Sequence, residues 1–231
     1  MKTVNILTRT SGRPNFFKIA HHSINAQSYP KIKHWVICDN GEHGYIKDYD
    51  DIDEIVNIPP GKYPHFDSYL NEVIEVLPKD ELFCMMDDDD FYTSPEAVGE
   101  AALTLGNNDV VFYQVRAVGG VVPSASMMRS GHKHLEFGQL SMLGFLMNTS
   151  FVHHSSGFLG FPPRYGGDFH FIDNVIKKQY PGVLYNHPRL KWIPKLFAST
   201  NPGRRWGKGE AQDISYKAAW AGYCQASTCP K

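Results

Sequence analysis

Short apolar runs alternate along the chain with segments in which apolar residues recur at helical spacing. The runs at residues 4–7, 35–38 and 82–86 have the length and composition of buried strands. Strands separated by helical segments are typical of an α/β fold with a central, mostly parallel sheet flanked by helices. Further runs that we expect as strands lie at residues 55–58, 109–115 and 183–185.

Four segments carry the apolar period of an amphipathic helix. The first opens at Pro14, since proline is favoured in the first turn of a helix. Another begins at Ser94-Pro95-Glu96, which predicts an N-cap, a first-turn proline and an early acid, and it runs to about Leu105. The other two lie near residues 70–77 and 168–180. The stretch 116–151 has poor periodicity and receives no element.

Composition and charge narrow the class of protein. The 231 residues are 42% hydrophobic and 20% charged, which fits one globular domain. With 23 basic and 24 acidic residues the net charge is −1, so no overall basic field exists to hold nucleic acid. No apolar stretch approaches the roughly 20 residues of a membrane span, and the chain begins with a strand-like run rather than a signal sequence. We expect a soluble, cytoplasmic protein without a nucleic-acid partner or a membrane span.

Four consecutive aspartates, Asp87, Asp88, Asp89 and Asp90, directly follow the apolar run at 82–86. Carboxylates packed this closely raise one another's pKa unless a cation neutralises them. Hard divalent cations take oxygen ligands and are commonly shared between one or two carboxylates and the phosphates of a substrate. The pattern therefore predicts a divalent metal together with a phosphorylated ligand.

Polar clusters end three of the expected strands: Thr8-Arg9-Thr10, Asp39-Asn40 and the four aspartates. In an open α/β sheet, ligands bind outside the carboxyl ends of the strands, so we expect these clusters to converge on one crevice. The first cluster continues through Ser11-Gly12-Arg13, which offers hydroxyls, backbone amides and a guanidinium to a nucleotide. Its single glycine argues against a P-loop or a dinucleotide-binding fingerprint.

Together these segments resemble the GT-A glycosyltransferases, in particular those of the family-two type. The resemblance covers roughly residues 1–195, and within the family the chain is similar to the capsid-glycosylating enzymes of chloroviruses. The segments that carry it are Ile6-Leu7-Thr8-Arg9-Thr10 with Gly12-Arg13-Pro14, Ser23 with Gln27-Ser28-Tyr29-Pro30, Val36-Ile37-Cys38-Asp39, and Met86 with the four aspartates.

The resemblance implies a single GT-A domain over residues 1–231. Its nucleotide-sugar-binding half would span about 1–115 and its acceptor-binding and catalytic half about 116–200, followed by a tail at 201–231. The donor implied is a nucleotide-sugar, with UDP favoured, and the acceptor is a glycan or glycoprotein. For a viral capsid glycoprotein, the reaction would take place in the cytoplasm of the host cell.

Donor and metal contacts follow from the same resemblance. Asp39 would contact the nucleotide base, although read alone it is an ordinary turn residue before Asn40-Gly41. The turn formed by Thr8, Arg9 and Thr10, with Arg13, would line the same pocket. Asp87 and Asp89 would be the acids of the Asp-x-Asp motif, and two residues apart on an extended chain they point to the same side. Asp89 would coordinate Mn²⁺ or Mg²⁺ directly, with Asp87 or Asp88 nearer the ribose or a metal-bound water. The alternative is a solvated acidic turn in which Asp90 caps a helix.

The resemblance also implies a catalytic base just before a helix in the second half of the domain. Asp168 occupies that place, but Gly167 replaces the acid that usually precedes it in the family. Asp168 could instead cap the helix, and Asp173 is the second candidate for the base. His187 is the positional candidate for a third metal ligand. One base without a protein nucleophile implies inversion at the anomeric carbon.

The sequence therefore predicts a metal-dependent inverting glycosyltransferase that uses a UDP-hexose or UDP-deoxyhexose. A sugar-nucleotide pyrophosphorylase is one alternative, although it should carry a glycine-rich basic loop after the first strand. A calcium-dependent carbohydrate-binding module without catalytic activity is the other, but it does not require nucleotide-pocket clusters at other strand ends. An EF-hand is excluded because Phe91 and Tyr92 stand where that loop needs further ligands and a glycine.

Overall fold

The computed structural model describes residues 1–39, 41, 43–59, 62, 70–117, 120–124, 127–128, 139–153, 167–181 and 187–200, and only the backbone of residues 167 and 168. The strands are β1 (Val4–Thr10), β2 (Ile32–Cys38), β3 (Glu54–Asn57), β4 (Leu82–Asp87), β5 (Asp90–Tyr92), β6 (Val110–Ala117), β7 (Gly120–Val122), β8 (Phe145–Asn148) and β9 (Leu190–Thr200). The helices are α1 (Pro14–Asn25), α2 (Leu70–Val76), α3 (Ala97–Leu105), α5 (Thr149–His153) and α6 (Gly167–Gln179), with a short 3-10 helix, η1 (Gly44–Asp48).

The nine strands form one sheet in the order β3-β2-β1-β4-β8-β6-β9-β5, with β7 paired to β6. Strands β1 to β4 run parallel to one another, and β6 runs parallel to β9. Strand β8 is antiparallel to both β4 and β6, and β5 is antiparallel to β9. The expected α/β fold with a mostly parallel sheet is confirmed.

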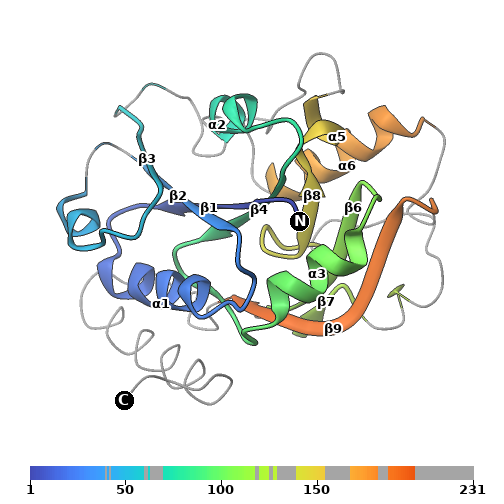
Figure 1. The fold of residues 1–231 in the computed structure, drawn as a ribbon, viewed down its shortest axis with the longest axis horizontal. Helices are drawn as coiled ribbons and strands as arrows, with labels where there is room; N and C mark the ends of the chain where they lie inside the picture. The colour runs from blue at the N-terminus through green and yellow to red at the C-terminus, as the bar shows by residue number, and fades with distance from the viewer. Residues whose placement is uncertain are drawn as a thin grey trace.

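Helices cover both faces of the sheet, as Figure 1 shows: α1 and α3 lie on one face, and α2, α5 and α6 on the other. Alternate residues of the central strands supply the two cores, because successive side chains of a strand point to opposite faces. In β4, Phe83 and Met85 pack with α2, α5 and α6, whereas Cys84 and Met86 pack with α1 and α3. The same alternation decides which polar residues meet at the ends of these strands.

Several boundaries differ from those predicted. Helix α3 begins at Ala97, because Ser94 forms a separate turn in which its hydroxyl accepts the Glu96 N–H (3.2 Å). The stretch without a predicted element contains β7, β8 and α5. The strand expected at 183–185 lies outside the described residues.

Strand β9 was not predicted, because its 11 residues contain a proline and two lysines. The pairing with β6 shifts from Tyr113↔Ile193 to Gln114↔Leu196, which leaves Pro194 and Lys195 as an irregularity in β9. Proline has no N–H for the ladder and is tolerated at such bulges. The apolar segment 196–198 then returns to the sheet and brings Thr200 beside Asp90 in β5.

Cys38 and Cys84, which fall in predicted strands, are both buried and form no disulfide. In the part of the chain that the structure describes, no helix is both long enough and apolar enough to cross a membrane.

Candidate functional site

The candidate site lies where β1 and β4 end side by side. The two strands are parallel neighbours, and their register places Arg9 opposite Asp87. Because side chains alternate, Arg9 and Asp87 continue the rows that face α2, α5 and α6, whereas Thr10 and Asp88 continue the rows that face α1 and α3. The expected convergence of the first and third polar clusters is therefore present.

On the first face, Arg9 forms an ion pair with Asp87. The Arg9 Nε donates to Asp87 Oδ1 at 2.9 Å, and Nη2 lies 2.6 Å from the same oxygen. The two side chains are 15% and 14% exposed, so both groups can still reach a ligand at the strand ends. This pair holds a cation and an anion at the open end of the sheet.

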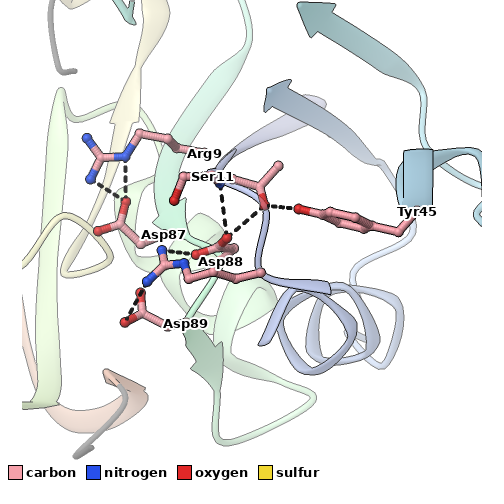
Figure 2. Close-up of polar contacts among 8 residues, drawn as sticks. Arg9, Ser11, Tyr45, Asp87, Asp88 and Asp89 are labelled. Atoms are coloured by element: carbon pink, nitrogen blue, oxygen red, sulfur yellow. Dashed lines mark hydrogen bonds and ion pairs between the residues drawn. The ribbon is translucent and has the colours of Figure 1, made fainter. Parts of the chain in front are cut away.

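On the second face, Asp88 is fully buried and receives donors from the turn that follows β1 (Figure 2). The Thr10 hydroxyl donates to Asp88 Oδ2 at 2.7 Å, and the Ser11 N–H donates to the same oxygen at 3.3 Å. The guanidinium of Arg13 contacts Asp88 Oδ1 through Nη2 and lies 3.5 Å from Asp89 Oδ2 through Nη1. Arg13 therefore bridges two of the four acids.

Charge and burial oppose each other in this cluster. Burial raises the pKa of Asp88 to about 7, the charge of Arg13 opposes that rise, and the neighbouring charge of Asp89 adds to it. Burial by itself would lower the pKa of Arg13, but the nearby carboxylates outweigh it and leave that pKa raised. The cluster therefore keeps a protonated guanidinium among its carboxylates.

Sequence reasoning missed the aromatic side of the site. Tyr45, in η1, places its hydroxyl 2.6 Å from Thr10 Oγ1, and its ring stacks on His43 with centroids 5.7 Å apart. His43 also faces Gly12, where a Cβ would lie 3.7 Å from the histidine Cε1 and where φ is +79°. No local pattern connects Tyr45 to Thr10, because 35 residues separate them.

The expected base contact, Asp39, lies at the same edge of the sheet. Its N–H donates to the carbonyl of Thr10 at 2.9 Å, which extends the β1–β2 pairing by one residue, and its side chain is half-buried. Thr8 lies deeper. Its side chain is fully buried, and its hydroxyl bonds to Nε2 of His34 in β2 at 2.8 Å, so Thr8 contacts the neighbouring strand rather than the open end of the turn.

The expected base, Asp168, lies in the first turn of α6, and its side chain is outside what the structure describes. The end of α6 is fixed at the amino edge of the sheet, since Gln179 Nε2 donates to the carbonyl of Phe151 (2.8 Å) and Tyr180 bonds to Asp109. A helix of 13 residues is about 20 Å long, enough to cross the sheet. Its first turn is therefore directed towards the carboxyl edge that carries Asp87. Asp173 is buried and bonded to Lys177 Nζ at 2.6 Å.

His187 lies at the opposite edge from the aspartates. Strand β9 runs parallel to β6, so the residues before it lie at the amino edge, where the His187 ring stacks on Tyr180 with centroids 3.8 Å apart. The structure therefore does not bring the expected third metal ligand to the acidic turn. Sequence position could not reveal this, because β9 itself was not predicted.

The acidic turn offers a divalent cation only part of a coordination shell. Among the described residues, no group of three or more His, Cys, Asp or Glu side chains is arranged to hold a metal ion. Asp87 and Asp89 remain as carboxylate donors at the strand end, and Mg²⁺-type cations are usually held by one or two carboxylates plus substrate phosphates. The residues fit a site completed by a phosphorylated ligand rather than a cage made by protein alone.

Comparison with known proteins places the fold. No protein-family model matches the chain, and no curated protein matches its sequence. Solved structures match along most of its length. TarS 1–349 of S. aureus in complex with UDP has a TM-score of 0.66 at 14% identity, over 97% of this chain and 65% of that one. The mannosyltransferase PcManGT of Pyrobaculum calidifontis, in complex with GDP-Man and Mn²⁺, has a TM-score of 0.61 at 12% identity, over 100% of this chain and 76% of that one.

Glucosyl-3-phosphoglycerate synthase of Mycobacterium tuberculosis, in complex with Mn²⁺, UDP and glucosyl-3-phosphoglycerate, has a TM-score of 0.57 at 12% identity, over 100% of this chain and 81% of that one. The chain spans 36% of the longer TarS structure, at a TM-score of 0.64, 15% identity and 86% of its own length. These likenesses establish the fold, which is the GT-A type predicted from the sequence.

Proposed function

We propose that this chain is a metal-dependent inverting glycosyltransferase that moves a sugar from a nucleotide-sugar donor to a hydroxyl group of a glycan. The observation that carries the proposal is the cluster of two arginines and three aspartates at the joined ends of β1 and β4. It lies in a fold shared with proteins solved with UDP or with GDP-Man and Mn²⁺. Neither feature alone would carry the proposal, because fold does not determine function.

The donor would lie across the turn after β1. Arg9, Thr10 and Arg13 offer two guanidiniums and a hydroxyl, and planar guanidiniums bind phosphate oxygens in a bidentate manner. Asp39, whose N–H bonds to the carbonyl of Thr10, would contact the nucleotide base. From the sequence resemblance we propose UDP as the nucleotide and a hexose or deoxyhexose as the sugar.

Asp89 and Asp87 would hold Mn²⁺, or Mg²⁺ in its place. Bound there, the cation would supply Lewis-acid assistance to the departure of the nucleoside diphosphate. While the donor and the cation are absent, the charges of the site are balanced by the chain's own residues, through the pairs Arg9–Asp87 and Arg13–Asp88. A site with its counter-ions already in place needs less reorganisation when the donor enters.

Asp168 would act as the general base. The acceptor oxygen forms a bond to the anomeric carbon, the bond from that carbon to the diphosphate breaks, and the acceptor proton passes to the Asp168 carboxylate. One displacement inverts the configuration at this carbon. Asp173 is the weaker candidate, because its carboxylate is already bonded to Lys177. The acceptor that we propose from the resemblance is a glycan on a viral capsid glycoprotein.

The first test is thermal denaturation with UDP, GDP or dTDP, with and without Mn²⁺. We expect UDP with Mn²⁺ to raise the melting temperature of the wild type and of Asp80→Asn, an exposed control before the amino end of β4, but not of Asp89→Asn. Asp168→Asn should keep this rise and lose about 100-fold or more of the transfer rate from a UDP-sugar, because it removes only the base.

Two other outcomes would indicate one of the alternative classes of protein instead. Stabilisation by Ca²⁺ alone, with no response to any nucleotide, would indicate a carbohydrate-binding module. Formation of UTP from a UDP-sugar and pyrophosphate would indicate a pyrophosphorylase. Either result contradicts the transferase.

A further inference from the structure

We propose that Asp88, the middle acid of the Asp-x-Asp motif, is a positioning residue rather than a ligand of the metal or the donor. Together with Thr10, Arg13 and Tyr45 it would lock the turn after β1 onto the turn after β4. The donor-binding surface would then be formed before any donor arrives. The inference rests on the proposed function, because it assigns a purpose to a turn that we take to bind the donor.

The contacts of Asp88 are made within the protein. Both of its carboxylate oxygens are engaged, Oδ1 by Arg13 and Oδ2 by the Thr10 hydroxyl and the Ser11 N–H. The side chain is 0% exposed, so a cation or a ribose hydroxyl could reach it only by displacing these donors. Asp87, one residue earlier, faces the other side of the sheet and is partly exposed.

The hydrogen bonds around Thr10 have a single consistent direction. A deprotonated Asp88 can only accept hydrogen bonds, so the Thr10 hydroxyl donates to it. The Thr10 oxygen must then accept a hydrogen bond from the Tyr45 hydroxyl. The Tyr45 oxygen in turn accepts the backbone N–H of Arg13. The turn from Thr10 to Arg13 is thus held by Asp88 on one side and by Tyr45 on the other, as the dashed contacts in Figure 2 show in part.

The backbone adds to this connection. The Asp88 N–H donates to the carbonyl of Arg9 at 3.0 Å, which continues the β1–β4 ladder one residue beyond β4. The two turns are 75 to 78 residues apart in sequence. Ordering a free turn when a ligand binds costs conformational entropy at every backbone residue that becomes fixed. A turn that is already ordered avoids that cost and therefore binds more tightly.

The test begins without a ligand. Hydrogen exchange of the backbone amides of residues 10–13 should be slow in the wild type and about 10-fold or more faster in Asp88→Asn and Tyr45→Phe, because each removes one side of the network. Thr10→Val, which keeps the shape but removes the hydroxyl, should behave like these variants, and Thr10→Ser should restore slow exchange. Tyr29→Phe is the matched control, since its hydroxyl bonds to the carbonyl of Lys2 away from this turn.

The second measurement is binding of UDP at saturating Mn²⁺. Tyr45→Phe should weaken the affinity for UDP by about 3- to 10-fold, the effect of losing one hydrogen bond. Asp88→Asn should weaken it by about 10- to 100-fold, because a charged acceptor is removed. Both variants should still bind one Mn²⁺ per UDP complex, counted by electron paramagnetic resonance. Asp89→Asn should lose the bound Mn²⁺.

Two results would overturn the inference. Unchanged exchange at residues 10–13 in both Asp88→Asn and Tyr45→Phe would show that no such lock exists. Loss of bound Mn²⁺ in Asp88→Asn with normal exchange would make Asp88 a metal ligand. If the wild type bound no nucleotide while the exchange results were as expected, the proposed function would fail and the role of Asp88 in ordering the turn would stand. Tyr45→Phe, which removes one oxygen atom, keeps the test valid if Asp88→Asn fails to fold.

Discussion

Two buried histidines connect α1 to the central strands. His34 in β2 is 2% exposed, with Nε2 on the Thr8 hydroxyl and Nδ1 facing the Nδ1 of His21 at 3.2 Å. One of these two Nδ1 atoms must accept a hydrogen bond from the other, so the two rings cannot both be charged without losing this hydrogen bond. Burial, and then the charge of His21, lowers the pKa of His34 to about 3. His21 bonds to Asp51 at 2.9 Å, which opposes the lowering of its own pKa by burial.

This arrangement predicts acid sensitivity. Because the folded-state pKa of His34 lies below the unfolded value of 6.5, the unfolded chain takes up a proton that the folded chain does not. Stability should therefore be full above pH 6.5 and fall by about 1.4 kcal/mol per pH unit as the pH drops from there towards 3. Urea unfolding at a series of pH values measures the slope. His34→Asn should flatten it relative to wild type, whereas His187→Asn should not; equal slopes in all three would contradict this assignment.

The pair Arg9–Asp87 gives a second prediction at this scale. Both side chains are mostly buried, so removing one charge leaves the other poorly solvated. Arg9→Met, which keeps most of the aliphatic length, should lower the free energy of unfolding by about 1–3 kcal/mol. Lys33→Met, at an exposed position of β2, should change it by less than about 0.5 kcal/mol. If Asp87→Asn rescued none of the loss in the double variant, the pair would not be the cause.

At the scale of elements, α3 takes its N-terminal cap from a distant segment. Its own N-cap residue, Glu96, makes no side-chain cap bond. Instead Gln27, just after α1, accepts the N–H of Val98 at 3.0 Å and donates to the carbonyls of Ser23 (3.0 Å) and Ser94 (2.9 Å). One side chain thus joins the end of α1 to the start of α3 and satisfies a first-turn N–H.

Gln27→Ala should therefore cost about 1 kcal/mol of stability, the usual effect of losing a cap. It should also increase hydrogen exchange at the Val98 amide more than at amides in the middle of α3. The exposed residue Asn107 provides a control, and Asn107→Ala should do neither. Protection of Val98 that survives the loss of Gln27 would contradict the role assigned to this side chain.

At the scale of the whole molecule, one sheet joins the two expected halves. Strand β8 from the second half pairs with β4, and β9 pairs with β5. The strands of residues 1–115 and those of residues 116–200 are therefore interleaved. Phe83 of β4 packs on Phe145 of β8 in the same core, with ring centroids 5.9 Å apart. The first of these two halves, residues 1–115, therefore has no core of its own that is separate from the second half.

A chain cut after residue 117 should accordingly fail to fold as a unit. It would expose the face of β4 that β8 covers, along with the apolar surface of α2. We expect this fragment to show no cooperative urea transition and a narrow amide dispersion by NMR, whereas the full chain should show a cooperative transition and a wide dispersion. A folded 1–117 fragment would mean that the halves are separate domains.

Apart from the short elements β5 and η1, the sequence determined the order of strands and helices over the first 115 residues, because apolar spacing is a local property of the chain. It also determined that carboxylates follow β4 and that a guanidinium-rich turn follows β1. It could not distinguish among the four aspartates, since each looks the same beside its neighbours.

Only the tertiary structure decided those roles. Asp88 faces inward because the alternation of β4 turns it towards Thr10, and Arg13 reaches it across 75 residues of sequence. Tyr45 and Gln27 act on partners 35 and 71 residues away, and His187 lies at the far edge because β9 runs parallel to β6. Hydrogen bonds and ion pairs between distant segments depend on the path of the whole chain, and no local pattern records that path.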